Sequence, residues 1–164
     1  MGSINVSGKQ AILPCHTEHF SADIFERLPD EVRIIANFSV GFDHVDLEAA
    51  RERGIPVGNT PDVLNGATAD MAMALLLAAS RRLIEGDTFA RSAGFTHYDP
   101  GYMLGREAHS STIGIIGLGR IGLQIAQRAV GFEMTILYHN RNPRSDLPAE
   151  LNARYVALNE LLEQ

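Results

Sequence analysis

The feature that most constrains the fold is a glycine-rich segment between two apolar runs. Thr112–Ile116 predicts a strand, the sequence GLGRIG follows at 117–122, and Thr135–His139 predicts a second strand. A lone G-x-G-x-x-G pattern is weak, because glycines are common, but a strand before it and a helix after it make it a dinucleotide-binding signature. A tight strand–helix turn without a ligand is the alternative. The pattern therefore predicts an α/β unit of the Rossmann type.

Each glycine of the pattern has its own predicted task. Gly117 permits the turn out of the strand, Gly119 lets backbone approach a pyrophosphate, and Gly122 lets the helix pack on the strand. The first N–H groups of a helix lack internal partners and suit an anion. The helix is predicted to end at Gly131, and it places apolar residues at helical spacing: Ile121, Ile125, Ala126, Ala129 and Val130.

Composition narrows the class of partner. The formal net charge of −6 argues against a nucleic-acid surface. The longest apolar run, Met71–Ala79, is too short to span a bilayer and predicts a buried helix. The single cysteine, Cys15, excludes an internal disulfide and fits a reducing cytoplasm. The polar stretch 1–10 has no secretory character. We therefore expect a cytoplasmic protein without nucleic-acid or membrane partners.

Short apolar runs alternate with helices upstream, a pattern typical of a parallel sheet. Buried strands are predicted at 11–13, 32–36 and 55–57, and helices at 22–28, capped by Ser21, and at 47–53, capped by Asp46 and stopped by Gly54. Two polar groups suggest metal or acid–base chemistry, but loop, turn and cap roles are favoured for both: Cys15, His16, Glu18 and His19, and Asp43, His44 and Asp46.

A long helix is predicted from a cap at Asn65 or Thr68 to Leu83. Because it is apolar nearly all round, it must be covered on every side, and we expect it between domains or at a subunit interface. A second short helix and a wrapping loop are expected within 81–105. A third strand is predicted at 155–157, followed by a helix capped by Asn159.

The end of the second strand bears on the choice of cofactor. An acidic residue at this position selects NAD through the ribose 2′-OH, whereas a nearby Arg accommodates the 2′-phosphate of NADP. Here Asn140 stands in place of the acid, and Arg141 and Arg144 follow. Guanidinium groups stay charged and can bind phosphate oxygens in a bidentate fork. The sequence predicts NADP(H) over NAD(H), unless both arginines are solvated turn residues.

Together these residues resemble the D-isomer-specific 2-hydroxyacid dehydrogenases, and most of all their NADP-using glyoxylate/hydroxypyruvate reductases. The resemblance runs from Ala11 to Gln164 and is far more specific than the glycine pattern alone. It is carried by residues 39–46, 54–57, 59–61, 67–70, 117–122 and 141–144.

The resemblance implies two domains and a set of site roles. Residues 1–58 would form part of a flavodoxin-like substrate domain, residues 59–164 would form part of the NAD(P)-binding domain, and the long apolar helix would support a homodimer. The N–H groups of Val40 and Gly41 would hold the substrate carboxylate. The implied cofactor contacts are Val63 and Thr68 near the nicotinamide, Gly117, Leu118, Gly119, Arg120, Ile121 and Gly122 at the pyrophosphate, and Asn140, Arg141 and Arg144 around the adenosine phosphate.

The resemblance also shows departures. The catalytic Arg, Glu and His of the family are expected beyond Gln164, and His44 and His139 match a turn and a strand end, so we assign no catalytic residue. Asn65–Gly66 replaces the family's Thr-acid pair. The first hypothesis is NADP(H)-dependent reduction of a small 2-keto acid, of the glyoxylate or hydroxypyruvate type, to the D-2-hydroxy acid, within a longer enzyme. The second is an NADP(H)-binding module or truncated remnant without catalysis.

Overall fold

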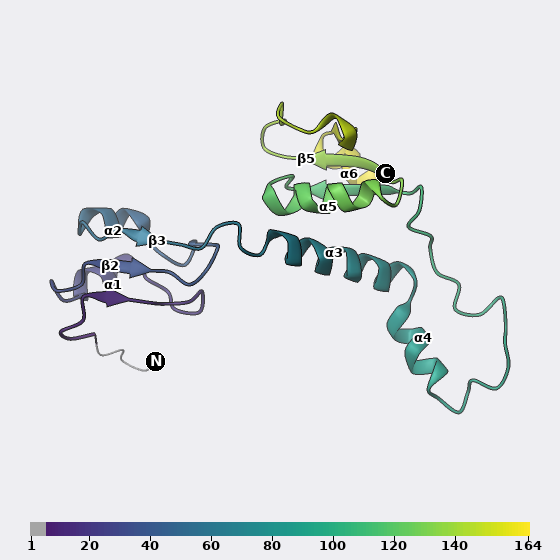
Figure 1. Ribbon diagram of the computed structural model, residues 1–164, viewed down its shortest axis with the longest axis horizontal. Helices are drawn as coiled ribbons and strands as arrows, with labels where there is room; N and C mark the ends of the chain where they lie inside the picture. Colours follow the sequence, from purple (N-terminus) through teal and green to yellow (C-terminus); the bar gives the residue numbers. More distant parts are fainter. Residues whose placement is uncertain (1–5) are drawn as a thin grey trace. The chain divides into compact units, whose positions relative to one another are not determined.

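The computed structural model describes residues 6–164 as two compact units, one ending at Val63 and the other comprising Leu64–Gln164 (Figure 1). The domain boundary expected between residues 58 and 59 stays a prediction. The expectation for residues 1–5, within the polar stretch 1–10, lies outside the described residues.

The first unit contains the predicted parallel sheet. Strands β1 (Ala11–Ile12), β2 (Ile34–Ala36) and β3 (Val57–Gly58) lie in the order β1-β2-β3. Helices α1 (Ala22–Arg27) and α2 (Leu47–Glu52) accompany the sheet. The core is built from apolar residues of both helices, β2 and the connecting segments: Phe20, Phe25, Leu28, Val32, Ile35, Val45, Ala49, Ala50 and Ile55.

Several predictions for the first unit are wrong. The strand predicted at 32–36 begins at Ile34, and the strand predicted at 55–57 is β3, Val57–Gly58, because Pro56 has no N–H to donate to a ladder. Both were predicted to be buried, but in β2 only Ile35 is buried and β3 has no buried residue. The strand at 11–13 exists as β1, but it is not buried, and Leu13 is 75% exposed, because β1 is an edge strand whose ladder ends before Pro14. Ser21 stands at the N-cap of α1, but its hydroxyl donates to the Asp23 carboxylate instead of accepting from backbone N–H.

The predicted cap and stop of α2 are confirmed. The Asp46 carboxylate accepts from the N–H groups of Glu48 and Ala49 at 3.1 and 3.0 Å. Gly54 follows the helix with φ of +64°, a left-handed conformation that glycine adopts without a steric penalty.

The second unit contains the predicted strand–turn–helix–strand. Strands β4 (Thr112–Ile116), β5 (Thr135–His139) and β6 (Arg154–Tyr155) form a parallel sheet in the order β4-β5-β6. Helix α5 (Arg120–Val130) runs beside it (Figure 1), and η1 (Ala149–Leu151) and α6 (Leu158–Glu163) complete this part. The main core cluster comprises Ile113, Ile115, Leu118, Ala126, Ala129, Ile136, Tyr138 and Leu151.

The long apolar run forms α3 (Asn65–Ser80), and the predicted short helix is α4 (Leu83–Ala90). Leu64 occupies the N-cap of α3 without a side-chain cap, so the cap predicted at Asn65 or Thr68 is wrong. The helix also ends before Leu83, because Arg82 takes a left-handed φ of +53°. Ala69 and Met73 are buried, but Met71 and Leu75 are 60% and 62% exposed, so within this chain the helix is not covered on every side as predicted. The Arg128 guanidinium binds the Asp70 carboxylate at 2.7 Å, which ties α5 to α3.

Smaller differences occur at other element ends. β6 begins one residue before the predicted strand, and Asn159 lies inside α6, whose N-cap is Ala157. Gly131 follows α5 as predicted but keeps a helical φ of −65°, and the left-handed residue is Glu133. Among residues 6–164, no helix combines the length and apolar character needed to cross a membrane.

Candidate functional site

The glycine-rich turn joins β4 to α5. Gly117 has φ of +95°, which turns the chain out of the strand, and its carbonyl accepts from the Gly119 N–H at 2.9 Å. A Cβ atom at Gly122 would come closer to the Gly117 carbonyl oxygen than the 3.0 Å that real Cβ atoms keep. Gly122 therefore lets the start of α5 pack against the turn.

Gly119 faces open space. A Cβ atom built there would meet nothing within 4 Å, and no side chain caps the N-terminus of α5 at this residue. Arg120 is exposed and Ile121 is half-buried in the first turn of the helix. The turn thus offers an approach to helix N–H groups from one side, which suits the pyrophosphate of a dinucleotide.

The turn is held from its other side by the segment after β5. Leu118 is fully buried, and its N–H donates to Asn140 Oδ1 at 2.6 Å. The carbonyl of the same residue accepts from Arg144 Nη1 at 3.0 Å. Asn140 and Arg144, which we expected to face the adenosine end, therefore also fix the backbone of the glycine-rich turn.

The two arginines of this segment differ in their surroundings. Arg144 donates from Nε and Nη2 to the two oxygens of Asp146, at 2.8 and 2.6 Å. Hydrogen bonding to Asp146 raises the pKa of Arg144, and the same bond lowers the pKa of Asp146. Arg141 is exposed, and its side chain makes no hydrogen bond or ion pair within the part of the chain that the structure describes.

A second backbone turn follows β2 in the first unit. The Asn59 Nδ2 donates to the Val40 carbonyl at 2.8 Å, and the Asn37 Nδ2 donates to the Gly41 carbonyl at 3.0 Å. Asn37 is 2% exposed, and its Oδ1 lies 3.1 Å from His44 Nε2. Because Asn37 uses Nδ2 as a donor, its Oδ1 accepts, and His44 carries a proton at Nε2.

This arrangement leaves the N–H groups of Val40 and Gly41 for a ligand. Within residues 6–164, neither N–H takes part in a hydrogen bond, whereas both carbonyls are occupied. A turn with its carbonyls held and its N–H groups open favours a small anion. Val63 is 74% exposed in the first unit, Thr68 lies in α3 of the second, and their contacts with a nicotinamide stay predictions.

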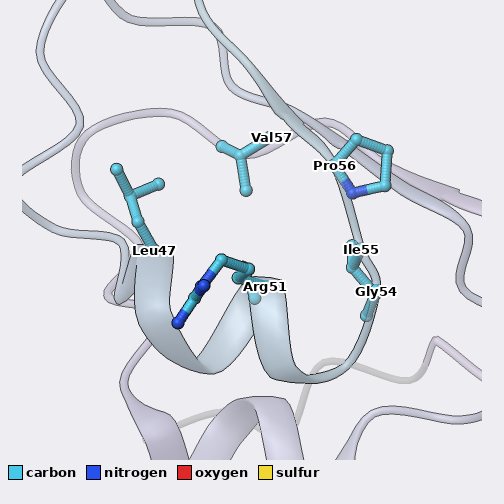
Figure 2. Close-up of a pocket in the computed structure, with 7 residues that line it drawn as sticks. Leu47, Arg51, Gly54, Ile55, Pro56 and Val57 are labelled. Atoms are coloured by element: carbon cyan, nitrogen blue, oxygen red, sulfur yellow. The ribbon is translucent and has the colours of Figure 1, made fainter.

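Two hollows lie in the first unit. One is lined by residues of α2 and the segment after it, with Leu47, Arg51 and Val57 around the opening (Figure 2). Arg51 is paired with Glu48 on the exposed side of α2. The other hollow, of about 340 Å³, lies at the ends of β1 and β2 and is lined by Leu13, Phe38 and their neighbours. The second is at the carboxyl ends of parallel strands, where ligands of open α/β sheets bind.

The remaining polar groups have structural partners. The Glu18 carboxylate accepts from the Cys15 N–H and the Thr17 hydroxyl at 2.8 and 2.7 Å. His139 Nδ1 lies 2.9 Å from the Val156 carbonyl oxygen. No group of three His, Cys, Asp or Glu side chains within residues 6–164 could hold a metal ion.

Sequence reasoning missed the side chains that support the two turns, which are Asn37, Asn59 and Asp146. Asn37 directly follows β2, where a buried polar residue signals a specific partner. Asp146, two residues after Arg144, suggests a local ion pair. Asn59 carries no comparable signal.

The fold and the glycine-rich turn define a dinucleotide-binding α/β unit. Residues 73–164 match the family described as D-isomer specific 2-hydroxyacid dehydrogenase, NAD binding domain. The chain belongs to this family, and the unit therefore binds a nicotinamide dinucleotide.

Known relatives agree with this assignment. The chain is 46% identical over 158 residues to a glyoxylate reductase of Pyrococcus horikoshii, covering 94% of this chain and 47% of the relative. A crystal structure of a Thermus thermophilus protein matches with a TM-score of 0.86 and 43% identity over 96% of this chain and 49% of that one. D-lactate dehydrogenase of Aquifex aeolicus, complexed with NAD and lactic acid, matches with a TM-score of 0.85 and 29% identity, covering 96% and 46% of the chains. The chain thus spans about half the length of the relatives it matches.

Proposed function

We propose that this chain supplies the cofactor site and part of the substrate site of an oxidoreductase that reduces a small 2-keto acid to a D-2-hydroxy acid. The proposal rests on the geometry of the glycine-rich turn. The turn has free space beside Gly119 for a ligand, and at Gly122 the helix packs too closely on the turn for any side chain. The names of the relatives, glyoxylate reductase and D-lactate dehydrogenase, support a small 2-keto acid, and we propose one of the glyoxylate or hydroxypyruvate type.

The residues of this chain bind and orient in the proposed reaction. The nicotinamide, when bound, supplies or takes up hydride. The first turn of α5, at Arg120 and Ile121, holds the pyrophosphate through backbone N–H groups, beside the open surface at Gly119. The N–H groups of Val40 and Gly41 hold the substrate carboxylate, which orients the keto group. We assign no proton donor to residues 1–164, so this chain contributes binding and orientation.

We further propose that the site prefers NADP(H). Asn140 cannot repel a 2′-phosphate as an acidic residue would, and the exposed Arg141 supplies an unpaired positive charge in the next position. A charge-assisted hydrogen bond contributes about 1.5–3 kcal/mol, which corresponds to roughly a 10- to 150-fold difference in affinity.

The experiment that tests this proposal is calorimetric titration of the 164-residue chain with NADPH and with NADH. We expect the dissociation constant for NADPH to be at least about tenfold lower. Equal constants would refute the preference, and binding of neither nucleotide would refute the site. Added glyoxylate is expected to cause no oxidation of NADPH by this chain, because the proposal assigns it no proton donor.

A homodimer is part of the proposal. Helices α3 and α4 expose large apolar side chains, with Met71 and Leu75 at 60% and 62% and Leu83 and Ile84 at 59% and 74%. Exposed apolar side chains that gather on neighbouring helices favour an interface. Light scattering of the 164-residue chain should give at least twice the monomer mass of 17.9 kDa, and Leu75→Glu should lower it. A monodisperse wild-type monomer would contradict the dimer.

A further inference from the structure

The two arginines after β5 have different tasks in the cofactor site. Both follow the strand that ends beside the glycine-rich turn, and both carry a full positive charge. Arg144 is about three-quarters buried at the side chain, with 24% exposed, and its donors face two acceptors of the protein. Arg141 is exposed without a partner among the described residues. A single role for both does not fit these surroundings.

Arg144 is fixed at its side chain and at its backbone. Its bidentate edge is occupied by Asp146, and Nη1 donates to the Leu118 carbonyl at 3.0 Å. Its backbone N–H donates to the Tyr138 hydroxyl at 3.1 Å, and Tyr138 is buried in β5. These contacts join β5, the following segment and the glycine-rich turn into one hydrogen-bonded unit.

A phosphate group could bind the Arg144 guanidinium only by competing with the Asp146 carboxylate for the same donors. The fork of the guanidinium that would bind two phosphate oxygens already binds the two oxygens of that carboxylate. The pair is close to neutral, so it offers little net attraction to an anion. Displacing Asp146 would also endanger the bond to Leu118, because all three contacts depend on one orientation of the guanidinium plane.

We propose that Arg144 is a positioning residue that holds the glycine-rich turn through the Leu118 carbonyl, that Asp146 keeps it in this orientation, and that Arg141 alone discriminates the 2′-phosphate. The proposal rests on the proposed NADP(H) site. According to this proposal, the turn that Arg144 holds contributes equally to the affinity for NADPH and for NADH. Arg141 contributes to the affinity for NADPH only.

The test compares NADPH and NADH dissociation constants of the 164-residue chain and four variants. Arg141→Ala should raise the dissociation constant for NADPH by about tenfold or more and leave that for NADH unchanged. Arg144→Ala should weaken both nucleotides by the same factor, and Arg144→Lys should restore part of the affinity for both, since a lysine retains a donor for Leu118. Asp146→Asn should weaken the binding of both nucleotides by one factor, smaller than that of Arg144→Ala, because Arg144 loses the carboxylate that fixes its orientation towards the Leu118 carbonyl.

Selective loss of NADPH affinity in Arg144→Ala, with NADH unchanged, would overturn the proposal. So would an unchanged ratio of the two constants in Arg141→Ala, or wild-type affinity for both nucleotides in Asp146→Asn. If the wild-type chain binds neither nucleotide, the proposed function fails and the positioning role is tested separately by NMR. In the nucleotide-free chain, Arg144→Ala should speed hydrogen exchange at the Leu118 N–H, whereas Arg141→Ala should not. Equal exchange in both variants and the wild type would overturn the positioning role.

Discussion

Two glycines of the same turn should respond in opposite ways to an added methyl group. At Gly122 a Cβ would press on the Gly117 carbonyl oxygen and lie 3.3 Å from Ile115 Cγ2, whereas at Gly119 it would meet nothing within 4 Å. Gly122→Ala therefore changes packing inside the protein. Gly119→Ala changes only the surface that we propose for the pyrophosphate, so the pair separates stability from binding.

The magnitudes follow from these surroundings. Overpacking costs about 1–3 kcal/mol, and the upper part of this range applies because a backbone carbonyl cannot rotate away as a side chain does. Alanine regains about 1 kcal/mol as the better helix former. Gly122→Ala should thus lower the free energy of unfolding by about 1–2 kcal/mol and the melting temperature by about 4–16 °C. Gly119→Ala should cost less than about 1 kcal/mol, because Gly119 caps α5 without a side-chain bond.

The assays are thermal unfolding followed by circular dichroism and titration with NADPH. Gly119→Ala should melt close to the wild type but bind NADPH more than about tenfold less tightly, since each charge-assisted bond contributes about 1.5–3 kcal/mol. The chain has no tryptophan, so the fluorescence of the reduced nicotinamide can be followed directly. Wild-type affinity in Gly119→Ala would refute the placement of the pyrophosphate. Wild-type stability in Gly122→Ala would refute the packing argument.

Three further predictions concern the first unit. Asp46→Ala should cost about 0.5–2 kcal/mol in urea unfolding, because two N–H groups of α2 lose their acceptor, while Asp46→Asn should keep most of the cap. Arg53→Ala should cost about 1–3 kcal/mol, since its guanidinium binds three carbonyls at the end of α1, and Arg53→Lys should cost less. The Thr17 hydroxyl and the Cys15 N–H lower the pKa of Glu18 from 4.5 to about 2. The stabilisation by Glu18 should therefore be complete above pH 4.5 and disappear as the pH falls towards 2, and acid unfolding of Glu18→Gln should show no such component. Identical acid unfolding curves would contradict it, and the expected effect is small because Glu18 is only partly buried and solvent screens its charge.

The sequence predicted the central part of the second unit residue by residue. The strands at Thr112–Ile116 and Thr135–His139 have the predicted bounds because their apolar runs are continuous and a glycine turn separates the first of them from α5. Near-continuous apolar runs of this kind are typical of strands in a parallel sheet. The family resemblance and the α/β class are confirmed on the same residues.

Predictions of helix caps and exposure were less successful. Ser21, Asn65 and Asn159 are residue types that favour caps, yet none of them caps a helix here, because each has another position or partner in the fold. Leu13 belongs to an apolar run, but its exposure depends on which side of the edge strand is covered. Neither outcome can be read from local composition, since both depend on contacts distant in sequence.

The sequence predicted the backbone N–H groups of the candidate sites but not all of the side chains that support them. A site made of backbone N–H groups leaves glycine as its sequence signal, and the residues at 117–122 carry that signal, whereas the role of Val40 and Gly41 was implied only by the family resemblance. The groups that hold such turns act through carbonyl oxygens, as Asn37 and Asn59 do at 40–41 and Arg144 does at Leu118. An amide or guanidinium with a backbone acceptor has no fixed spacing from that acceptor: the three separations are 4, 19 and 26 residues. Occupied carbonyls beside open N–H groups, as at Val40 and Gly41, are therefore a structural signature of an anion-binding turn, and the glycine-rich turn shares the occupied carbonyls.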